Sequence, residues 1–375
     1  MQKMHQLAEN SAFIGELPKG CKFCGPGQKM VLLITGKCKC RCFYCPLSFR
    51  KRGKDTIYAN ELKVRNLTDI INEAKAISAK GTGITGGDPL SKPDRTLKAI
   101  KLLKETFGVD HHIHLYTAGK FDPKFISKLA SSGLDELRFH PPVITWDRPT
   151  NKFIALVTEA IKTNMVIGSE IPVLPGYEKK IVKYAKTLDL LNVNFLNLNE
   201  LEFSESNWEN LKKHGYRQKN ELANTVFGSE TLGIKILRDL SKEPDFNLNV
   251  HYCSAQFKDR QQLTNRLKRR ARNVKMPYFI LTDDGTFLIG IIEPIALEDL
   301  QELIVVKKYL HDCYAVPEKL MHLNKYLHRL EVAPWVLERL KNELSEDLRF
   351  RCFIVEEYPT ADRLEVEKIP INEFK

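Results

Sequence analysis

The chain has 375 residues, of which 43% are hydrophobic, and a formal net charge of +11. This length suffices for one large domain and a smaller one. No apolar run reaches the roughly 18 residues needed to cross a bilayer, which predicts that nothing spans a membrane. The N-terminal segment is charged and lacks the apolar core of a signal peptide, so we expect a cytoplasmic protein. The positive charge predicts an anionic partner, of which nucleic acid is the commonest kind.

Short apolar runs alternate with longer amphipathic runs from Met30 onward, which predicts strands that alternate with helices. The expected strands are Met30–Thr35, Gly81–Thr85, His112–Thr117, Glu136–Phe139, Val166–Val173 and Asn194–Leu201. The expected helices are about Asn60–Ala79, Lys92–Thr106, Pro123–Ser131, Asn151–Thr163 and Lys179–Leu191. Successive β/α units of this kind imply a parallel sheet, either doubly wound or curled into a full or partial barrel.

The pattern changes after about residue 206, where a mostly helical stretch leads to one short strand, Leu248–Tyr252, and a basic helix. Further on, two apolar runs flank Asp283-Asp284-Gly285, which is a hairpin signal, and a last strand is expected at Arg351–Glu356. We therefore divide the chain into an N-terminal arm with cysteines (1–29), a core (30–206), a helical extension (207–275) and a C-terminal α+β domain (276–375).

Cysteine usage points to metal chemistry. Six of the nine cysteines lie between residues 21 and 45. In a reducing cytosol such crowding favours metal binding over disulfides. Cys38, Cys42 and Cys45 form C-x3-C-x2-C directly after the first core strand. Three thiolates at this spacing can ligate three irons of a cubane and leave the fourth iron open, as chemistry at the metal requires.

The segment TGKCKCRCFYCP, residues 35–46, resembles the signature of the radical S-adenosylmethionine (SAM) superfamily, including an aromatic residue, Tyr44, before the last cysteine. The resemblance covers about residues 30–205 and points to proteins related to the pyruvate formate-lyase activating enzymes, in particular an archaeal group. It implies a partial (β/α)6 TIM-like barrel, here with a small C-terminal α+β domain. It also implies a [4Fe–4S] cluster, SAM and a reducing electron donor of the ferredoxin or flavodoxin type. In such enzymes one electron cleaves SAM, and the 5′-deoxyadenosyl radical abstracts hydrogen from the substrate.

The same resemblance assigns a SAM pocket at the C-terminal ends of the strands, where β/α folds place their chemistry. The turn Gly86-Gly87-Asp88-Pro89 looks like the family's GGEP segment, whose backbone receives the amino group of SAM. Asp88 replaces the usual Glu, which leaves the role of that side chain open. Glu170 is the candidate ribose contact by analogy. The other cofactor candidates are Tyr44, Thr117, Asn197 and Asn199, the last two near the adenine.

A second metal site is one interpretation of the remaining cysteines. Cys21 and Cys24 are spaced C-x2-C, and Cys253 ends a predicted strand. Together they could hold a second iron–sulfur cluster with an open site, or zinc with His251 as the fourth ligand. The alternative is two free cysteines and one buried thiol. A zinc ribbon formed by the N-terminal pair and the first two cysteines of the triad would leave the third cysteine and the glycine turn unexplained.

Three cysteines receive no metal. The family pattern leaves the position of Cys40 unassigned, so we expect it not to be a ligand. Cys313 and Cys352 lie in apolar contexts and are predicted to be core residues.

A histidine cluster covers residues 111–114. His112 and His114 share one face of a predicted strand. Packing, or polarity around the SAM site, explains this pair better than a metal site does.

A basic segment extends from Lys258 to Lys275, with eight basic residues and a single acid, Asp259. The alternative to substrate binding is a solvated helix whose arginines pair with acids of neighbouring elements. The C-terminal domain shows no RNA-binding signature such as an aromatic RNP motif. Because such side chains suit phosphate or carboxylate groups, the candidate substrate contacts are Lys258, Arg266, Arg269 and Arg270.

Three functions are consistent with these patterns. Modification of RNA, above all tRNA, fits the net charge and the basic helix, and predicts salt-sensitive RNA binding. Modification of a protein, such as activation of a glycyl-radical enzyme, fits the resemblance to activating enzymes. A non-enzymatic zinc module that contacts nucleic acid predicts a colourless protein that does not cleave SAM.

Overall fold

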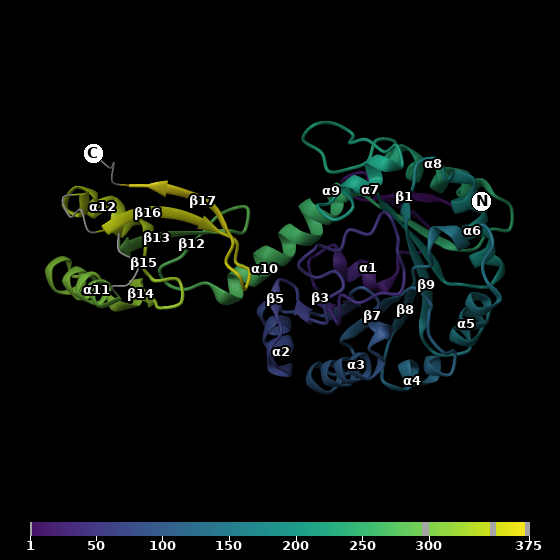
Figure 1. The fold of residues 1–375 in the computed structure, drawn as a ribbon, viewed down its shortest axis with the longest axis horizontal. Coiled ribbons are helices and arrows are strands. Elements are labelled where there is room, and N and C mark those ends of the chain that lie inside the picture. The colour runs from purple at the N-terminus through teal and green to yellow at the C-terminus, as the bar shows by residue number, and fades with distance from the viewer. Residues whose placement is uncertain (1, 295–299, 346–349, 372–375) are drawn as a thin grey trace. The chain divides into compact units, whose positions relative to one another are not determined.

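The computed structural model describes residues 2–294, 300–345 and 350–371. The chain forms two compact units, Met1–Leu263 and Thr264–Lys375 (Figure 1). Within the described residues, no helix is both long enough and apolar enough to cross a membrane.

One eleven-stranded sheet organises the first unit, in the order β1-β2-β11-β10-β9-β8-β7-β6-β3-β4-β5. The seven strands from β11 to β3 in that order are parallel, and short antiparallel strands extend the sheet at both edges. The strands are β1 Met4–Gln6, β2 Ala12–Ile14, β3 Lys29–Leu33, β4 Tyr58–Ala59, β5 Leu62–Lys63, β6 Gly81–Thr85, β7 His112–Thr117, β8 Glu136–Phe139, β9 Val166–Val173, β10 Phe195–Glu200 and β11 Asn249–Cys253.

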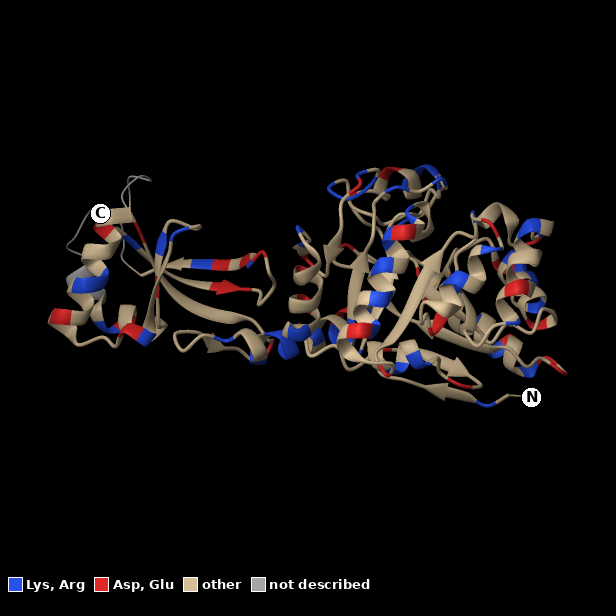
Figure 2. Ribbon diagram, turned by 90° about the horizontal axis from the view of Figure 1, so that it is seen from below, with Lys and Arg blue, Asp and Glu red and all other residues tan. Residues whose placement is uncertain are grey.

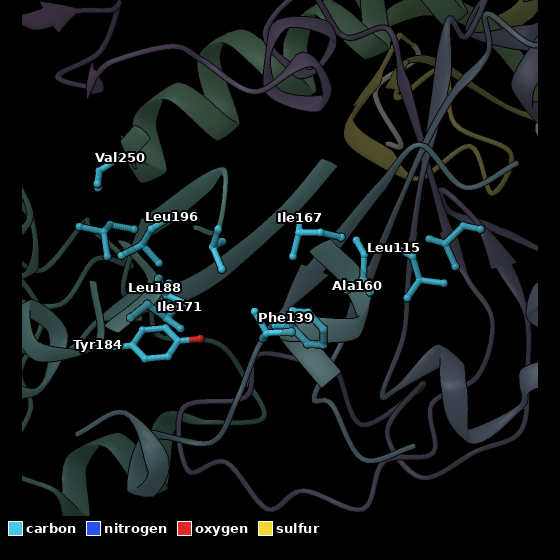
Figure 3. Close-up of a cluster of buried hydrophobic side chains, with 14 of the residues drawn as sticks. Leu115, Phe139, Ala160, Ile167, Ile171, Tyr184, Leu188, Leu196 and Val250 are labelled. Carbon is cyan, nitrogen blue, oxygen red and sulfur yellow. The ribbon is translucent and has the colours of Figure 1, made fainter. Parts of the chain in front are cut away.

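The outer face of this sheet carries the hydrophobic core. Leu115, Phe139, Ile167 and Leu196 are almost completely buried and pack against the inner faces of the covering helices (Figure 3). Burying an aliphatic side chain of this size stabilises the fold by about 1.5–3 kcal/mol. The helices of the unit are α1 Lys19–Cys24, α2 Leu67–Ala76, α3 Pro93–Phe107, α4 Phe125–Ser131, α5 Asn151–Ile161, α6 Glu178–Leu190, α7 Trp208–Lys213, α8 Ser229–Lys242 and α9 Ala255–Phe257, followed by a π-helical turn Lys258–Leu263.

The inner face of the curved sheet is polar, and helix α1 lies against it. Figure 1 shows the parallel strands curving around α1, with α2 to α6 on the outside. The α1 backbone is fixed there because the amide of Gly20 donates to the carboxylate of Glu136 on β8 at 3.3 Å. The N-terminal arm is therefore part of the barrel rather than an appendage. It is also held by pairing of β2 with β11.

The predicted fold class is confirmed: a partial TIM-like barrel with a small C-terminal α+β domain. Each of the six predicted core strands is present with nearly the predicted bounds. The short strand expected at Leu248–Tyr252 is β11, and it joins the parallel sheet as a seventh strand, so the barrel extends beyond the predicted core boundary at residue 206.

One helix was predicted with the wrong start. We expected it to begin at Asn60, but Asn60 has a left-handed φ of 50° and forms the turn between β4 and β5. Helix α2 begins only at Leu67, after a capping box in which Asn66 accepts from the Asp69 amide and Asp69 accepts from the Asn66 amide. Such a cap contributes about 1 kcal/mol and fixes where the helix starts.

The second unit is a six-stranded antiparallel sheet with its own hydrophobic core. The predicted hairpin is present as β12 and β13, with Gly285 at a φ of 88° in the turn. Because α10 groups with this unit, the boundary lies at residue 264 rather than at the predicted 276. The elements are α10 Thr264–Val274, β12 Ile280–Leu281, β13 Phe287–Pro294, α11 Leu300–Tyr314, β14 Met321–Asn324, β15 Arg329–Val332, α12 Pro334–Ser345, β16 Phe350–Glu357 and β17 Glu365–Pro370.

Candidate active site

The loop after β3 carries the cysteine triad and is anchored on both sides. Cys38 is exposed, whereas Cys42 and Cys45 are half-buried. The Cys45 carbonyl accepts hydrogen bonds from the Arg52 guanidinium at 3.2 Å and from the Ser206 hydroxyl at 3.3 Å. These bonds hold the backbone of the loop and leave its thiols to other partners.

The donor set of this loop fits an iron–sulfur cluster. The backbone N–H of Cys40 donates to the Cys38 sulfur at 3.3 Å, the kind of contact that stabilises a thiolate bound to iron. Of the four cysteines in this loop, the three with the C-x3-C-x2-C spacing would leave one corner of a cubane without a protein thiol. Cys38, Cys42 and Cys45 are therefore the residues that would hold the cluster.

The cysteine loop and the glycine turn after β6 are hydrogen-bonded to each other. The Gly87 amide donates to the Thr35 carbonyl at 2.7 Å, and the Asp88 amide donates to the Lys37 carbonyl at 2.8 Å. A Cβ on Gly87 would lie 2.3 Å from the Lys37 carbonyl oxygen, and one on Gly86 would lie 2.3 Å from the Thr35 carbonyl oxygen. Only glycine permits this close approach. The predicted SAM turn thus lies directly beside the predicted cluster loop.

Asp88 links the ends of two neighbouring strands. Its carboxylate accepts from the Leu90 amide at 3.0 Å, the Thr117 hydroxyl at 3.1 Å and the Ala118 amide at 3.2 Å. Burial raises the pKa of Asp88, although the amides of Leu90 and Ala118 oppose the rise. Asp88 stands where the family usually has Glu, and these contacts indicate the role of its side chain. Asp88 is a positioning residue that fixes the turn to the end of β7.

Glu170 lies at the centre of a buried network on the inner face of the barrel. Its carboxylate accepts from Arg138 at 2.8 Å, from Asn197 at 2.9 Å and from Asn199 at 2.8 Å, with the Tyr116 hydroxyl at 3.3 Å. Burial by itself would raise the pKa of Glu170, but the Arg138 charge and the two amides outweigh it and lower the pKa. The structure therefore brings together three of the residues predicted to contact SAM.

This network limits what Glu170 can do. Four donors already approach the roughly four lone-pair sites of its carboxylate, which leaves little capacity for a ribose hydroxyl. The ribose contact stays a prediction that the arrangement does not favour. Asn197 differs, because its side-chain oxygen is buried and has no hydrogen-bond partner among the described residues.

Sequence reasoning missed Arg138. This side chain is only 2% exposed and donates to Glu136, Tyr116 and Glu170. The sequence could have indicated it, because side chains alternate between the two faces of β8. Glu136 and Arg138 therefore share one face of a strand that is buried on both sides. A charged pair on a fully buried strand indicates a polar interior.

The second group of cysteines also faces the interior of the barrel. The Cys21 sulfur accepts from Asn197 at 3.4 Å and from Arg138 at 3.6 Å. Cys253 is buried at the end of β11, and its sulfur accepts from the Gln262 amide at 3.7 Å. Burial raises the pKa of Cys253, Lys258 opposes the rise, and the thiols of Cys21 and Cys24 add to it.

The histidine cluster follows the packing explanation. His111 pairs with the Thr82 hydroxyl at 2.9 Å, and His112 pairs with the Lys29 ammonium at 3.0 Å. Burial lowers the pKa of His111 to about 4 and that of His112 to about 2, so both rings are neutral near pH 7. Within the described ranges, no three His, Cys, Asp or Glu side chains surround a point where a single metal ion would fit.

The candidate substrate contacts fall in both units. Lys258 belongs to the first unit and pairs with Glu202 at 2.9 Å. Arg266, Arg269 and Arg270 lie on α10 in the second unit. Figure 2 shows Lys and Arg interspersed with Asp and Glu along most helices, whereas α10 carries basic residues and no Asp or Glu. Substrate binding by these four side chains stays a prediction.

The two cysteines predicted to be core residues differ. Cys352 on β16 is buried, as predicted. The prediction for Cys313 was wrong, because it is exposed near the end of α11. Helix α11 buries Leu303, Val306 and Leu310, and Cys313 continues their spacing but lies in the last turn of the helix, where residues 311–313 are all exposed.

Comparison with known proteins covers both units. The model of the radical SAM superfamily matches residues 32–186, and a model described as "Domain of unknown function (DUF8061)" matches residues 285–371. A protein of Methanocaldococcus jannaschii with the name "putative glycyl-radical enzyme activating enzyme" is 38% identical over 95% of this chain and 93% of its own length.

More distant relatives share the name "probable GTP 3′,8-cyclase". One from Methanococcus maripaludis is 30% identical over 28% of this chain and 33% of its own length. One from Thermococcus kodakarensis is 22% identical over 70% of this chain and 75% of its own length. With the cysteine loop, the glycine turn and a relative that matches nearly the whole length, this chain belongs to the radical SAM superfamily and is an enzyme of that family.

Proposed function

We propose that this enzyme abstracts hydrogen from a protein, and that the reaction activates a glycyl-radical enzyme. The observation that carries the proposal is the likeness to the Methanocaldococcus jannaschii protein, because it extends through the second unit as well as the barrel. The RNA substrate expected from the net charge finds no support among these relatives, so we do not propose tRNA modification.

The cysteine loop and the turns beside it supply the reaction centre. When bound, a [4Fe–4S] cluster and SAM provide a 5′-deoxyadenosyl radical through one-electron cleavage. Cys38, Cys42 and Cys45 would hold the cluster, and the backbone of Gly86 and Gly87 would hold the SAM amino group beside it. This assignment of the cluster to the loop and of SAM to the turn is supported by the backbone hydrogen bonds that join the two segments.

The polar interior fixes the other side of the SAM pocket. Arg138 is buried, Glu170 is partly buried, and the two charged side chains are paired, so they are held in one arrangement before any ligand binds. Preorganised polar groups of this kind orient a ligand without reorganising during the reaction. The amide oxygen of Asn197 offers an acceptor to that ligand.

The proposal is tested by following deuterium into 5′-deoxyadenosine. The full chain is reconstituted anaerobically with iron, sulfide, SAM and a reductant, and supplied with extract from cells whose proteins carry deuterium only at the glycine α-carbon. We expect deuterated 5′-deoxyadenosine and a glycyl radical signal in electron paramagnetic resonance.

Two controls complete this experiment. A Cys42→Ala variant lacks one cluster ligand and should give no 5′-deoxyadenosine. A second extract carries deuterium only in its nucleosides and should give unlabelled product. Deuterium that arrives from the RNA fraction and not from glycine would contradict a protein substrate.

A further inference from the structure

We propose that Cys21, Cys24 and Cys253 hold a second iron–sulfur cluster inside the barrel of the first unit. This site is separate from the Cys38, Cys42 and Cys45 loop, and it does not depend on which substrate the enzyme uses. Three independent features of the fold bring these cysteines together.

The first feature is the position of helix α1, which lies inside the ring of strands (Figure 1). Cys21 and Cys24 are three residues apart on this helix and therefore share one face. The Cys21 side chain points into the barrel, because its sulfur contacts Asn197 on β10 and Arg138 on β8. A Cβ on Gly20 would lie 2.5 Å from the Arg138 guanidinium, so the helix could not lie so close with a larger residue there.

The second feature is the seventh parallel strand, β11, which ends at Cys253. In the sheet register, Cys253 lies opposite Asn199 and His251 lies opposite Asn197. Asn197 and Asn199 both donate to Glu170, and Asn197 also contacts the Cys21 sulfur. Cys253 therefore lies on the strand next to the one that Cys21 contacts, on the same inner face.

The third feature is the contact between the end of α1 and the segment after β11. A Cβ on Gly25 would lie 3.3 Å from the ring of Phe257. Gly25 follows Cys24, and Phe257 is four residues beyond Cys253. The C-terminal end of α1 thus meets the chain just after Cys253, and residues more than 200 positions apart in the sequence become neighbours.

The surroundings resemble those of a bound group rather than an apolar core. His251 is 2% exposed, and neither of its ring nitrogens has a hydrogen-bond partner among the residues described. The same holds in the described chain for Nδ1 of His114, which also faces the barrel interior. An unsatisfied buried polar atom costs about 1–3 kcal/mol, so several in one place indicate a missing partner.

The arrangement favours a cluster over a single zinc ion. No three ligating side chains in the described ranges surround one point, and this is true of the Cys38 loop as well. A cubane presents its irons at separate corners, so its cysteine sulfurs stand farther apart than those around one ion. N–H groups from Asn197 and Gln262 already point at the sulfurs of Cys21 and Cys253, as they do at ligands of iron–sulfur clusters.

The test counts iron and sulfide in the full chain after anaerobic reconstitution. We expect about eight irons and eight sulfides per chain, the content of two [4Fe–4S] clusters. The double variant Cys21→Ser/Cys253→Ser should fall to about four, and Cys352→Ser, which changes a buried cysteine of the second unit, should stay at about eight.

A second measurement keeps the test valid even if the Cys21→Ser/Cys253→Ser variant does not fold. The triple variant Cys38→Ala/Cys42→Ala/Cys45→Ala should still hold about four irons, with an electron paramagnetic resonance signal that SAM does not change. About four irons in the native chain and none in the triple variant would overturn the proposal, as would stoichiometric zinc in place of iron. The deuterium experiment reports on the substrate alone, so failure of either proposal is recognised separately.

Discussion

Arg138 is a buried cation with two carboxylate partners, one of them fully buried and the other partly buried. Its guanidinium pairs with Glu136, which is fully buried, and with Glu170 at 2.8 Å. A charge in such a place is costly unless every partner is present, because the protein interior solvates ions poorly. The three side chains therefore depend on one another, and they fix the interior against which α1 and the SAM pocket are built.

Replacing Arg138 with methionine should destabilise the protein by about 3–5 kcal/mol, since the buried Glu136 and the partly buried Glu170 both lose their counter-charge. The urea midpoint of unfolding, followed by circular dichroism, measures this change. Arg238→Met, at an exposed position on α8, is the matched control and should shift stability by less than about 0.5 kcal/mol.

A second variant distinguishes the loss of the Arg138 charge from the change in side-chain shape. The triple variant Arg138→Met/Glu136→Gln/Glu170→Gln removes the unpaired charges and should recover most of the lost stability. If Arg138→Met unfolds at the same urea concentration as the native chain, the network does not stabilise the barrel.

At the scale of elements, the cysteine loop and the glycine turn act as one assembly. The loop after β3 and the turn after β6 are joined by two backbone hydrogen bonds, and both leave parallel strands that lie side by side. Their spacing along the chain indicated what each does. Their mutual distance follows from the pairing of β3 with β6.

Gly87→Ala should separate these two segments. The added Cβ would meet the Lys37 carbonyl oxygen at 2.3 Å, and backbone on both sides cannot yield as a side chain can. We expect the rate of reductive SAM cleavage to fall at least about tenfold, because a displacement near 1 Å in a reaction centre costs a factor of that order or more. Product formation per reconstituted cluster measures the effect.

Gly53→Ala, in the cysteine loop, is the control. Gly53 has a φ of 74°, so alanine is strained there by about 1 kcal/mol, but its Cβ would meet no other atom of the described structure within 4 Å. SAM cleavage by this variant should remain close to native. Equal losses in both variants would mean that the contact between the Gly87 position and the Lys37 carbonyl does not explain the loss.

At the scale of the molecule, each of the two units has a hydrophobic core of its own. The radical SAM model matches only within the first unit, and the second family model matches only within the second. Reaction centre and appended domain are therefore separable in structure.

The fragment 1–263 should fold and cleave SAM without the second unit. It contains the cysteine triad, the glycine turn and the whole eleven-stranded sheet. Cooperative thermal unfolding and 5′-deoxyadenosine formation without added substrate check this expectation. A fragment that aggregates, or that retains iron but cannot cleave SAM, would show that the barrel requires the second unit.

The sequence alone determined the features that depend on neighbouring residues. The spacing of Cys38, Cys42 and Cys45 and the glycine turn are local patterns, so family and cofactors could be inferred from them. The alternation of buried strands with amphipathic helices likewise predicted the barrel, since strand and helix periods are local. Local patterns failed at Asn60, where a left-handed turn interrupts an apparently helical run.

Only the tertiary structure decided which distant residues meet. Cys21 faces the interior of the barrel because α1 is inserted there, and the pairing of β2 with β11 ties the N-terminal arm to the strand that ends at Cys253. Arg138 finds Glu170 because β8 and β9 are adjacent in the sheet. Contacts of this kind depend on sheet order and register, which are set by packing over the whole unit. The spacing of neighbouring residues in the sequence therefore does not predict them.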